Sequence, residues 1–283
     1  MRLQATAARA ASLLAKNPSL FCRLLFAKLN TARPMPPLPA RRRIGGVLFE
    51  YDLEHYRGTA PMYFGSYSLL VVQAMERILG PGDVFIDVGA NIGYLSAVAA
   101  GLVGVGGAVH AFEPVPAYFA KLQKLVALNP AHSITANACA VGDVQGAATI
   151  HVTHEPGQST LVRGYKTAPQ IAARMEVPLE RLDSYFECHS IDRPALIKID
   201  AEGFEFPALR GLAGYFRASA HRPPIICEIA PRAYSLLGRG LADLARFMAD
   251  FGYLACDLID GETPVDIRAL DHVEDVLFVA KGE

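Results

Sequence analysis

The sequence predicts an α/β fold in which helices cover both faces of a mostly parallel sheet. Short apolar segments that suit strands alternate with segments that suit helices from Gly82 onward, as in repeated βα units with buried parallel strands. The turn after the first of these strands is rich in glycine, which is typical of a strand that leads into a helix beside a ligand. Two consecutive strand segments close the chain and are expected to add an antiparallel strand at the C-terminus.

These elements can be placed in order along the chain. The five core strands are expected at residues 84–88, 108–112, 134–141, 195–199 and 225–229. The helices that alternate with them are expected at residues 95–102, 117–127, 206–212 and 241–251. An irregular stretch follows the third strand, with an extra strand at residues 149–152 and a loop at residues 156–169. The closing strand pair is expected at residues 253–258 and 276–280.

An N-terminal arm, residues 1–45, differs in composition from the α/β domain expected over residues 46–283. Residues 1–49 contain nine Lys and Arg and no acid, whereas the remaining 234 residues contain 18 basic and 28 acidic residues. Two short helices are expected in the arm, because Asn17 suits an N-cap and Pro18 suits the first helical position of the second helix. Four prolines in residues 33–40 predict a stiff linker.

Three interpretations of this basic arm stay open. It can be a helical lid that packs on the domain with its charged side chains in solvent. It can be an interfacial helix that binds an acidic membrane or an acidic partner. It can also be a targeting peptide, because it is rich in arginine and lacks acidic residues.

The composition of the whole chain limits the classes of function. The formal net charge of -1 provides no overall basic field for nucleic acid. The five cysteines include no CxxC pair, so neither a zinc site nor a disulfide framework is indicated, and a reducing cytosol fits. No run of about 18 apolar residues indicates a transmembrane helix. We therefore expect a cytoplasmic protein, peripheral to the membrane if the arm binds lipid.

The most informative local motif is DVGANIG at residues 87–93, where an apolar strand leads into a helix. Its glycines permit a tight turn and let a ligand approach the backbone closely. Glu113 ends the next strand, twenty residues after Gly93, where a carboxylate can accept hydrogen bonds from ribose hydroxyls. The combination predicts a site for an adenosine-containing cofactor beyond the carboxyl ends of the strands. A purely structural turn is the alternative.

The leading acid of this motif helps to distinguish between adenosine cofactors. A dinucleotide site needs an open G-x-G-x-x-G turn that seats a pyrophosphate at the helix N-terminus, whereas the spacing here is D-x-G-x-N-x-G. Asp87 would repel a pyrophosphate if it faced the site. It could instead receive the ammonium group of an amino-acid moiety, directly or through water. The motif therefore favours S-adenosylmethionine over NAD.

A second cluster of charged residues follows the fourth strand. Strand alternation places Lys198 and Asp200 on one side of the sheet, and Glu202 and Glu205 follow in the next loop. Crowded carboxylates raise one another's pKa and a neighbouring lysine lowers it, so one of them could act as a general base. Glu228, at the end of the fifth strand, borders the same cleft.

Other roles for these acids stay open. We expect no resident metal, although the carboxylates could bind a divalent cation because hard oxygen ligands cluster here. They could also only hold the loop and cap the next helix, with Glu205 in its first turn. A dedicated base could be absent. Among the histidines, His154 in the irregular stretch and His55 before the first strand are further candidates for the base.

The chain resembles the FkbM-type methyltransferases, a branch of the class I S-adenosylmethionine-dependent enzymes, over about residues 80–282. The segments that carry the resemblance are FIDVGANIGYLS (85–96), HAFEPVPAYFAKL (110–122), AVGD (140–143), GQST (157–160), PLERLDSY (178–185), LIKIDAEGFEFPALRG (196–211) and IICEI (225–229). The resemblance implies a Rossmann-like class I methyltransferase fold that binds S-adenosylmethionine. It also implies that Glu113 binds the ribose and that the backbone of Ala140 and Val141 borders the adenine. The residues implied at the cofactor turn are Gly89, Ala90, Asn91 and Gly93, to which Asp87 and Asp200 are added from their positions.

The predicted function is S-adenosylmethionine-dependent methyl transfer. The resemblance implies a hydroxyl acceptor on a small molecule, a secondary metabolite or a glycan, and amine acceptors stay open. The catalytic candidates are Asp200, Glu202, Lys198 and His154. One alternative is an NAD(P)-linked oxidoreductase on a similar fold, which the glycine spacing and the reversed closing strand pair disfavour. The other is a catalytically inactive nucleoside-binding module, which the intact motif disfavours.

Overall fold

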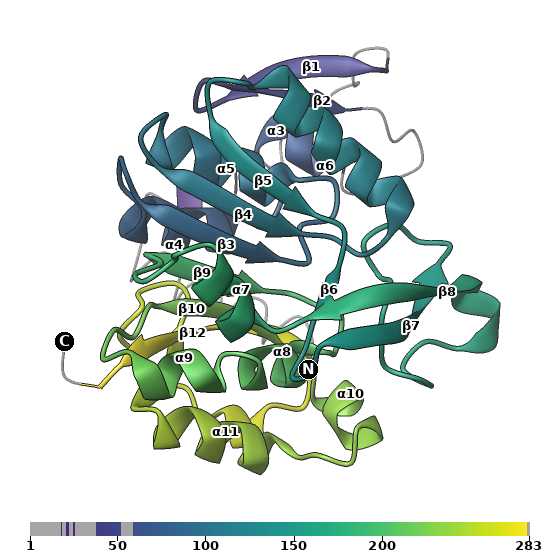
Figure 1. Cartoon of the computed structure of the whole chain (residues 1–283), viewed down its shortest axis with the longest axis vertical. Coiled ribbons are helices and arrows are strands. Elements are labelled where there is room, and N and C mark those ends of the chain that lie inside the picture. The colour runs from purple at the N-terminus through teal and green to yellow at the C-terminus, as the bar shows by residue number, and fades with distance from the viewer. Residues whose placement is uncertain (1–17, 19–20, 23–24, 26–37, 52–58, 282–283) are drawn as a thin grey trace.

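The computed structural model describes residues 18, 21–22, 25, 38–51 and 59–281. A seven-stranded sheet runs through the described chain in the order β11-β12-β10-β9-β3-β4-β5 (Figure 1). The strands are β3 (Val84–Val88), β4 (Ala108–Phe112), β5 (Ser133–Asn137), β9 (Leu196–Ile199), β10 (Ile225–Ile229), β11 (Tyr253–Asp257) and β12 (Glu274–Ala280). Neighbours are parallel except where β12 pairs with β10 and with β11. The predicted mostly parallel sheet with an antiparallel C-terminal strand is confirmed.

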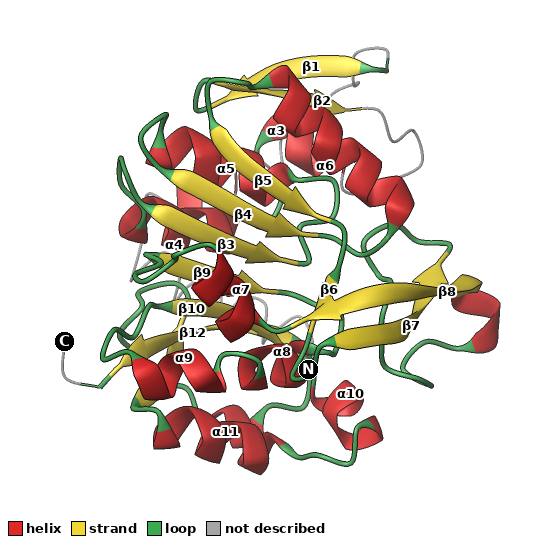
Figure 2. Ribbon diagram, viewed as in Figure 1, coloured by secondary structure: helices red, strands yellow, loops and turns green. Residues whose placement is uncertain are grey.

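Helices cover both faces of this sheet, as Figure 2 shows. Phe85 and Ile86 are adjacent on β3 yet belong to different apolar clusters, because successive side chains of a strand point to opposite faces. The helices on the face of Phe85 are α3 (Thr59–Phe64), α4 (Leu69–Ile78), α5 (Tyr94–Val103) and α6 (Pro116–Leu128). Those on the face of Ile86 are α7 (Leu182–Cys188), α8 (Glu205–Arg210), α9 (Ala213–Ala218), α10 (Pro231–Leu236) and α11 (Leu241–Asp250).

The predicted third strand at residues 134–141 is wrong, because the chain divides it between two sheets. β5 ends at Asn137, and β6 (Ala140–Val141) pairs with β8 (Ile171–Glu180) in a three-stranded sheet that β7 (Gly146–Thr153) completes. An apolar run can be buried equally well in either sheet, so its sequence does not show where the chain changes sheets. β8 is not predicted either, because its buried and exposed residues alternate only from Met175 onward.

A hairpin of β1 (Ala40–Ile44) and β2 (Val47–Tyr51) packs against the domain, with β2 in contact with α5 and α6. The division expected at residue 45 falls in the turn of this hairpin and stays a prediction. The predicted helices of the arm and most of its linker lie outside the described residues. Phe21, which is described, packs against Leu69 and Ile259. Within the described part of the chain, no helix combines the length and the apolar character needed to cross a bilayer.

Candidate active site

The corner between β3 and α5 is held against the two neighbouring strands. Gly89 has φ +76, and a Cβ at this position would lie 1.8 Å from the carbonyl oxygen of Asp200, at the end of β9. The N–H groups of Gly89 and Ala90 donate to the carbonyl oxygen of Phe112, at the end of β4, at 3.0 and 2.9 Å. Gly93 has φ +85 and precedes the first residue of α5. Only glycine meets both the positive φ and the close approach at position 89.

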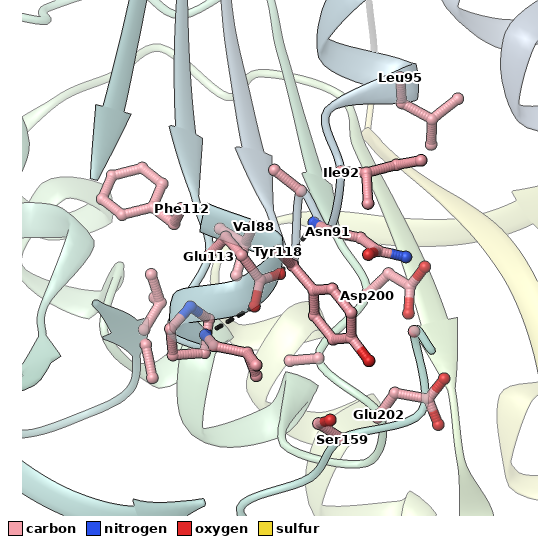
Figure 3. Close-up of a pocket in the computed structure, with 18 of the residues that line it drawn as sticks. Val88, Asn91, Ile92, Leu95, Phe112, Glu113, Tyr118, Ser159, Asp200 and Glu202 are labelled. Carbon is pink, nitrogen blue, oxygen red and sulfur yellow. Dashed lines mark hydrogen bonds between the residues drawn. The ribbon is translucent and has the colours of Figure 1, made fainter. Parts of the chain in front are cut away.

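Glu113 lies directly after β4 and borders the cavity at this corner. Its Oε2 accepts a hydrogen bond from the N–H of Asn91 and its Oε1 accepts one from the N–H of Val115, both at 2.8 Å (Figure 3). Burial raises the pKa of Glu113 to about 7, although the two N–H groups act in the opposite direction. Because a carboxylate has about four lone-pair sites, Glu113 can still accept hydrogen bonds from a ligand.

Asp87 lies beneath the corner and does not face the cavity. Its side chain is fully buried, and its Oδ2 accepts a hydrogen bond from the Ser96 hydroxyl at 2.6 Å. Its Oδ1 accepts no hydrogen bond from the described residues, and its partner there is the charge of Lys198, whose Nζ lies 3.4 Å away. Asp87 lines neither of the two cavities described below. A buried carboxylate needs such partners because leaving it unpaired costs several kcal/mol. The expected direct contact between Asp87 and a ligand ammonium group is therefore not available in this arrangement.

A cavity with about 850 Å³ of empty space, open solvent included, lies at the corner. The predicted residues that line it are Gly89, Ala90, Asn91, Glu113, Ala140, Val141, Lys198, Asp200 and Glu202. Gly93 is not part of this lining. The lining residues that the sequence does not predict include Phe112, Val115, Tyr118, Cys139, Ser159 and Leu161. Val115 and Tyr118 lie within the segment at 110–122 that carries the resemblance, so their proximity to Glu113 in the chain is the feature that could have indicated them.

The chemistry of this lining fits S-adenosylmethionine. Phe112 and Val141 offer apolar surface for a purine, and Glu113 offers a carboxylate for the ribose. Oδ1 of Asn91 is buried and, among the described residues, has no hydrogen-bond partner. A buried acceptor without a partner costs about 1–3 kcal/mol, so this oxygen indicates a contact with a ligand donor such as an ammonium group. Figure 3 shows the Asn91 side chain beside Asp200 in the same cavity.

The charged cluster at the end of β9 forms as the sequence predicts. Nζ of Lys198 lies 3.4 Å from Oδ2 of Asp200. Glu202 carries φ +50 and is held by the loop between β7 and β8 at two points. Nζ of Lys166 lies 3.0 Å from its Oε2, and the hydroxyl of Thr160 donates to its carbonyl oxygen at 2.6 Å. The loop at residues 157–167 is thus fastened to the turn that carries the candidate catalytic carboxylates.

Burial changes the acid–base properties of this cluster. It raises the pKa of Glu202 to about 7, with the charge of Asp200 adding to the effect and Lys166 opposing it. It also raises the pKa of Glu205 to about 7. Glu205 is fully buried, however, and accepts hydrogen bonds from the N–H groups of Ala201 and Gly203 at 3.0 and 2.7 Å. Glu205 therefore holds the turn, in agreement with the structural alternative for this residue.

A second cavity of about 560 Å³ adjoins the first. The residues that line both cavities are Tyr67, Leu95, Gly157, Lys198, Asp200 and Glu202. The second cavity is also lined by Glu228 on β10 and by Asp275, its direct cross-strand partner on β12. Burial, followed by the charge of Asp200, raises the pKa of Glu228 well above its usual range. The sequence predicts Glu228 at this cleft, whereas Asp275 enters it only through strand pairing.

Of the two predicted histidines, His154 is described, and it is not brought to this cluster. The His154 side chain is exposed and lines neither cavity, and its backbone N–H donates to the carbonyl oxygen of Gln170 at 3.0 Å. His55 lies outside the described residues. No group of three or more His, Cys, Asp or Glu in the described ranges is arranged to hold a metal ion.

A family model described as the methyltransferase FkbM domain matches residues 87–255. The chain is similar to Methyltransferase 1 of Beauveria bassiana (strain ARSEF 2860), with 31% identity over 150 residues, which are 47% of this chain and 59% of the relative. It is also similar to the 31-O-demethyl-FK506 methyltransferase FkbM of Streptomyces tacrolimicus, with 41% identity over 99 residues, which are 35% of each chain. The matched segment spans less than two thirds of either relative.

Two solved structures align with the chain. The methyltransferase FkbM from Methylobacillus flagellatus KT gives a TM-score of 0.44 at 16% identity and covers 92% of this chain and 60% of that chain. The fibrillarin of Aeropyrum pernix, solved with bound S-adenosyl-L-methionine, gives a TM-score of 0.44 at 11% identity and covers 88% of this chain and 86% of that chain.

Proposed function

Because the chain belongs to the FkbM methyltransferase family, whose model matches residues 87–255, we propose that it transfers a methyl group from S-adenosylmethionine to a hydroxyl group. The observation that carries this proposal is the junction of two cavities at Lys198, Asp200 and Glu202. A methyl donor in the first cavity and an acceptor in the second would meet at these side chains. The acceptor class that we propose is a small molecule, a secondary metabolite or a glycan.

The first cavity supplies the contacts for the donor. Glu113 accepts hydrogen bonds from the ribose hydroxyls, and the backbone of Ala140 and Val141 borders the adenine. Oδ1 of Asn91 accepts a hydrogen bond from the ammonium group, which satisfies an acceptor that otherwise lacks a partner. When bound, S-adenosylmethionine supplies a methyl group that its sulfonium already activates.

The second cavity orients the acceptor. Asp200 borders both cavities, and its side chain is 37% exposed. Its carboxylate accepts the proton of the acceptor hydroxyl, while Glu202 accepts a second hydrogen bond from the same molecule. Because the donor is already activated, alignment and exclusion of water account for most of the rate. The loop at residues 157–167 is fastened to Glu202 and contributes Gly157 to the lining of both cavities, so it borders the junction.

Calorimetric titration of the full chain with S-adenosylmethionine, S-adenosylhomocysteine and NADH tests the proposed donor. We expect both sulfur compounds to bind and NADH to produce no heat. Binding of NADH alone would overturn the proposal in favour of an oxidoreductase. Binding of the sulfonium without methyl transfer to any acceptor in a screen of hydroxyl and amine compounds would favour the inactive binding module.

An Asp200→Asn variant tests the role of the carboxylate once the screen has provided an acceptor. We expect turnover to fall about 100-fold, the usual contribution of a general base. The measurement is transfer of tritium from S-adenosyl-[methyl-³H]methionine to that acceptor, with Glu187→Gln, an exposed carboxylate on α7, as the control. A variant with full turnover would remove Asp200 as the base.

A further inference from the structure

Lys198 is a cation buried within the central sheet. It lies on β9 between Asp87 of β3 and Ile226 of β10, and it is 4% exposed. Moving an ammonium group from water into a protein interior costs several kcal/mol unless partners compensate the charge. An apolar residue of similar length would fill this position at lower cost, so the presence of a lysine calls for a physical explanation.

The partners of this ammonium group belong to both sides of the proposed reaction. Nζ lies 3.1 Å from the carbonyl oxygen of Gly89 and 3.4 Å from that of Val88, both at the cofactor corner. It also lies 3.4 Å from Oδ1 of Asp87 and 3.4 Å from Oδ2 of Asp200. Lys198 itself lines both cavities. One charged group is thus hydrogen-bonded to the donor corner and ion-paired with the carboxylate that faces the acceptor.

The corner and the backbone segment that carries Asp200 are also packed closely against each other. A Cβ on Gly89 would lie 1.8 Å from the carbonyl oxygen of Asp200, so the two backbone segments are in contact. Methyl transfer requires the acceptor oxygen, the methyl carbon and the sulfur to align, and small misplacements cost large factors in rate. A single ammonium group that is bonded to both segments sets their relative position at the point where alignment matters.

From these contacts we infer that Lys198 is a positioning residue, which fixes the Asp200 carboxylate relative to the Gly89 corner and so the acceptor relative to the methyl donor. The inference rests on the proposed methyltransferase function and adds the group that aligns its two halves. Lys198 acts through Asp200 and the corner. It does not exchange a proton with the acceptor, because its ammonium group donates to the carbonyl oxygens of Val88 and Gly89 and pairs with the carboxylates of Asp87 and Asp200.

A proton-transfer role for Lys198, which the sequence leaves open, is disfavoured on electrostatic grounds. Burial lowers the pKa of Lys198, but the charges of Asp200 and Asp87 outweigh burial, and its pKa lies above the usual value for lysine. The group therefore stays protonated near neutral pH. A lysine that served as a base would need the opposite shift.

A purely structural role is the main alternative, and paired variants separate it from positioning. Lys198→Met alone leaves Asp87 buried without its cation, so a loss of stability is expected from that variant under either role. Lys198→Met combined with Asp87→Asn removes both charges while keeping similar shapes. Lys124→Met is the matched control, because Lys124 pairs with Glu50 and is 46% exposed.

The readout is the ¹³C resonance of S-adenosyl-[methyl-¹³C]methionine bound to the full chain, together with the affinity for S-adenosylhomocysteine and the thermal midpoint. In Lys198→Met/Asp87→Asn we expect the thermal midpoint to return towards the wild-type value. We expect the affinity to stay about tenfold weaker, from the loss of charge-assisted hydrogen bonds at the corner, and the methyl resonance to move towards the free-ligand position. If affinity and resonance both return with stability, Lys198 is merely structural and the inference is overturned.

Asp200→Asn gives an independent test, because the Asp200 side chain is partly exposed and of the same size as asparagine, so this variant is expected to fold. We expect Asp200→Asn to shift the methyl resonance in the wild-type background and to cause no further shift in the Lys198→Met/Asp87→Asn background. Equal shifts in the two backgrounds would show that Lys198 does not act through Asp200. Failure of the wild-type chain to bind S-adenosylmethionine would overturn the proposed function itself, whereas these variant results bear on Lys198 alone.

Discussion

The two sides of the candidate active site differ in the kind of groups that form them. The cofactor side consists mainly of backbone groups and the side chains of Asn91 and Glu113, from two short segments, residues 87–93 and 112–115, bonded directly to each other. The acceptor side consists of charged side chains that reach one place from β9, β10, β12 and the loop at residues 157–167. The first side joins two segments at the ends of the neighbouring strands β3 and β4, which follow each other in the chain, and the second depends on how more distant segments pair.

This difference indicates where each side tolerates change. Backbone geometry at the cofactor corner leaves no room for another side chain, so substitutions there cause strain and overlap. The partly exposed side chains on the acceptor side, such as Lys166 and Glu202, can be exchanged at smaller cost, since their interaction is mainly electrostatic. The acceptor side is therefore where we expect acceptor preference to be altered at little cost in stability, and the cofactor side is where changes should be most damaging.

The largest effect is expected for Gly89→Ala. Its Cβ would overlap the carbonyl oxygen of Asp200, and φ is +76, so we expect about 3 kcal/mol or more of lost stability from strain and overpacking. Gly65→Ala is the matched control, because Gly65 has φ +74 and no described atom lies within 4 Å of the added carbon. That control should cost only about 1–2 kcal/mol. Urea unfolding followed by circular dichroism measures both, and equal losses would contradict the close approach.

A smaller effect is expected for Glu113→Gln at the same side. The amide has one acceptor oxygen for two backbone N–H groups that each bond a carboxylate oxygen at 2.8 Å. It also removes the charge that strengthens hydrogen bonds to ribose hydroxyls. We expect the affinity for S-adenosylhomocysteine to fall about tenfold or more, as for hydrogen bonds to charged groups. Calorimetry against the Glu187→Gln control measures this change, and unaltered affinity would place the ribose elsewhere.

The pH dependence of cofactor binding tests the same role of Glu113. Burial raises the pKa of Glu113 to about 7, so the free chain holds this group largely protonated below pH 7 and ionised above it. Binding that favours the carboxylate should therefore strengthen as pH rises through about 7 and weaken by up to about tenfold per unit below it. Calorimetry between pH 5.5 and about 8 should show this trend. The trend should be absent in Glu113→Gln, and its persistence there would assign it to another group.

The smallest effect is expected for Lys166→Met on the acceptor side. The Lys166 and Glu202 side chains are 13% and 21% exposed and 3.0 Å apart, and a partly exposed pair contributes at most about 1 kcal/mol. Because Lys166 lowers the pKa of Glu202, its removal should raise that pKa further above about 7. Urea unfolding should show a loss near this limit, compared with almost none for Arg246→Met, whose pair with Asp243 is largely exposed. A loss of stability above about 3 kcal/mol would mean that the Lys166–Glu202 ion pair behaves as a buried pair and contributes more than a partly exposed one.

Local sequence patterns predicted most core strands, but they did not predict where the chain changes from one sheet to another. The expected strands at residues 84–88, 108–112 and 225–229 have the observed bounds, because each is a short apolar run bounded by turn residues. The strand at 134–141 failed because burial in either of two sheets gives the same apolar pattern. β8 escaped prediction because most of its side chains are not buried in alternation.

Site residues divide in the same way. Glu113 and the glycines could be assigned because their roles depend on a turn of a few residues. The inward direction of Asp87 could not, because it follows from the position of Lys198 on a neighbouring strand. The exposure of His154 and the entry of Asp275 likewise depend on where strands pair. A charged residue of a given type can contact a ligand or form an ion pair inside the protein, and the residues that surround it determine which role it has.

The sequence by itself determined the alternation of strands and helices, the glycine corner and the acid that follows the second core strand, because these features rest on interactions within a few residues. Tertiary structure alone decided that two cavities meet at Lys198, Asp200 and Glu202 and that the loop at residues 157–167 is fastened to Glu202. The physical reason is the separation along the chain between the residues that interact. Hydrogen bonds within a turn are fixed by backbone geometry, whereas electrostatic contacts between distant strands exist only once the sheet order brings them together.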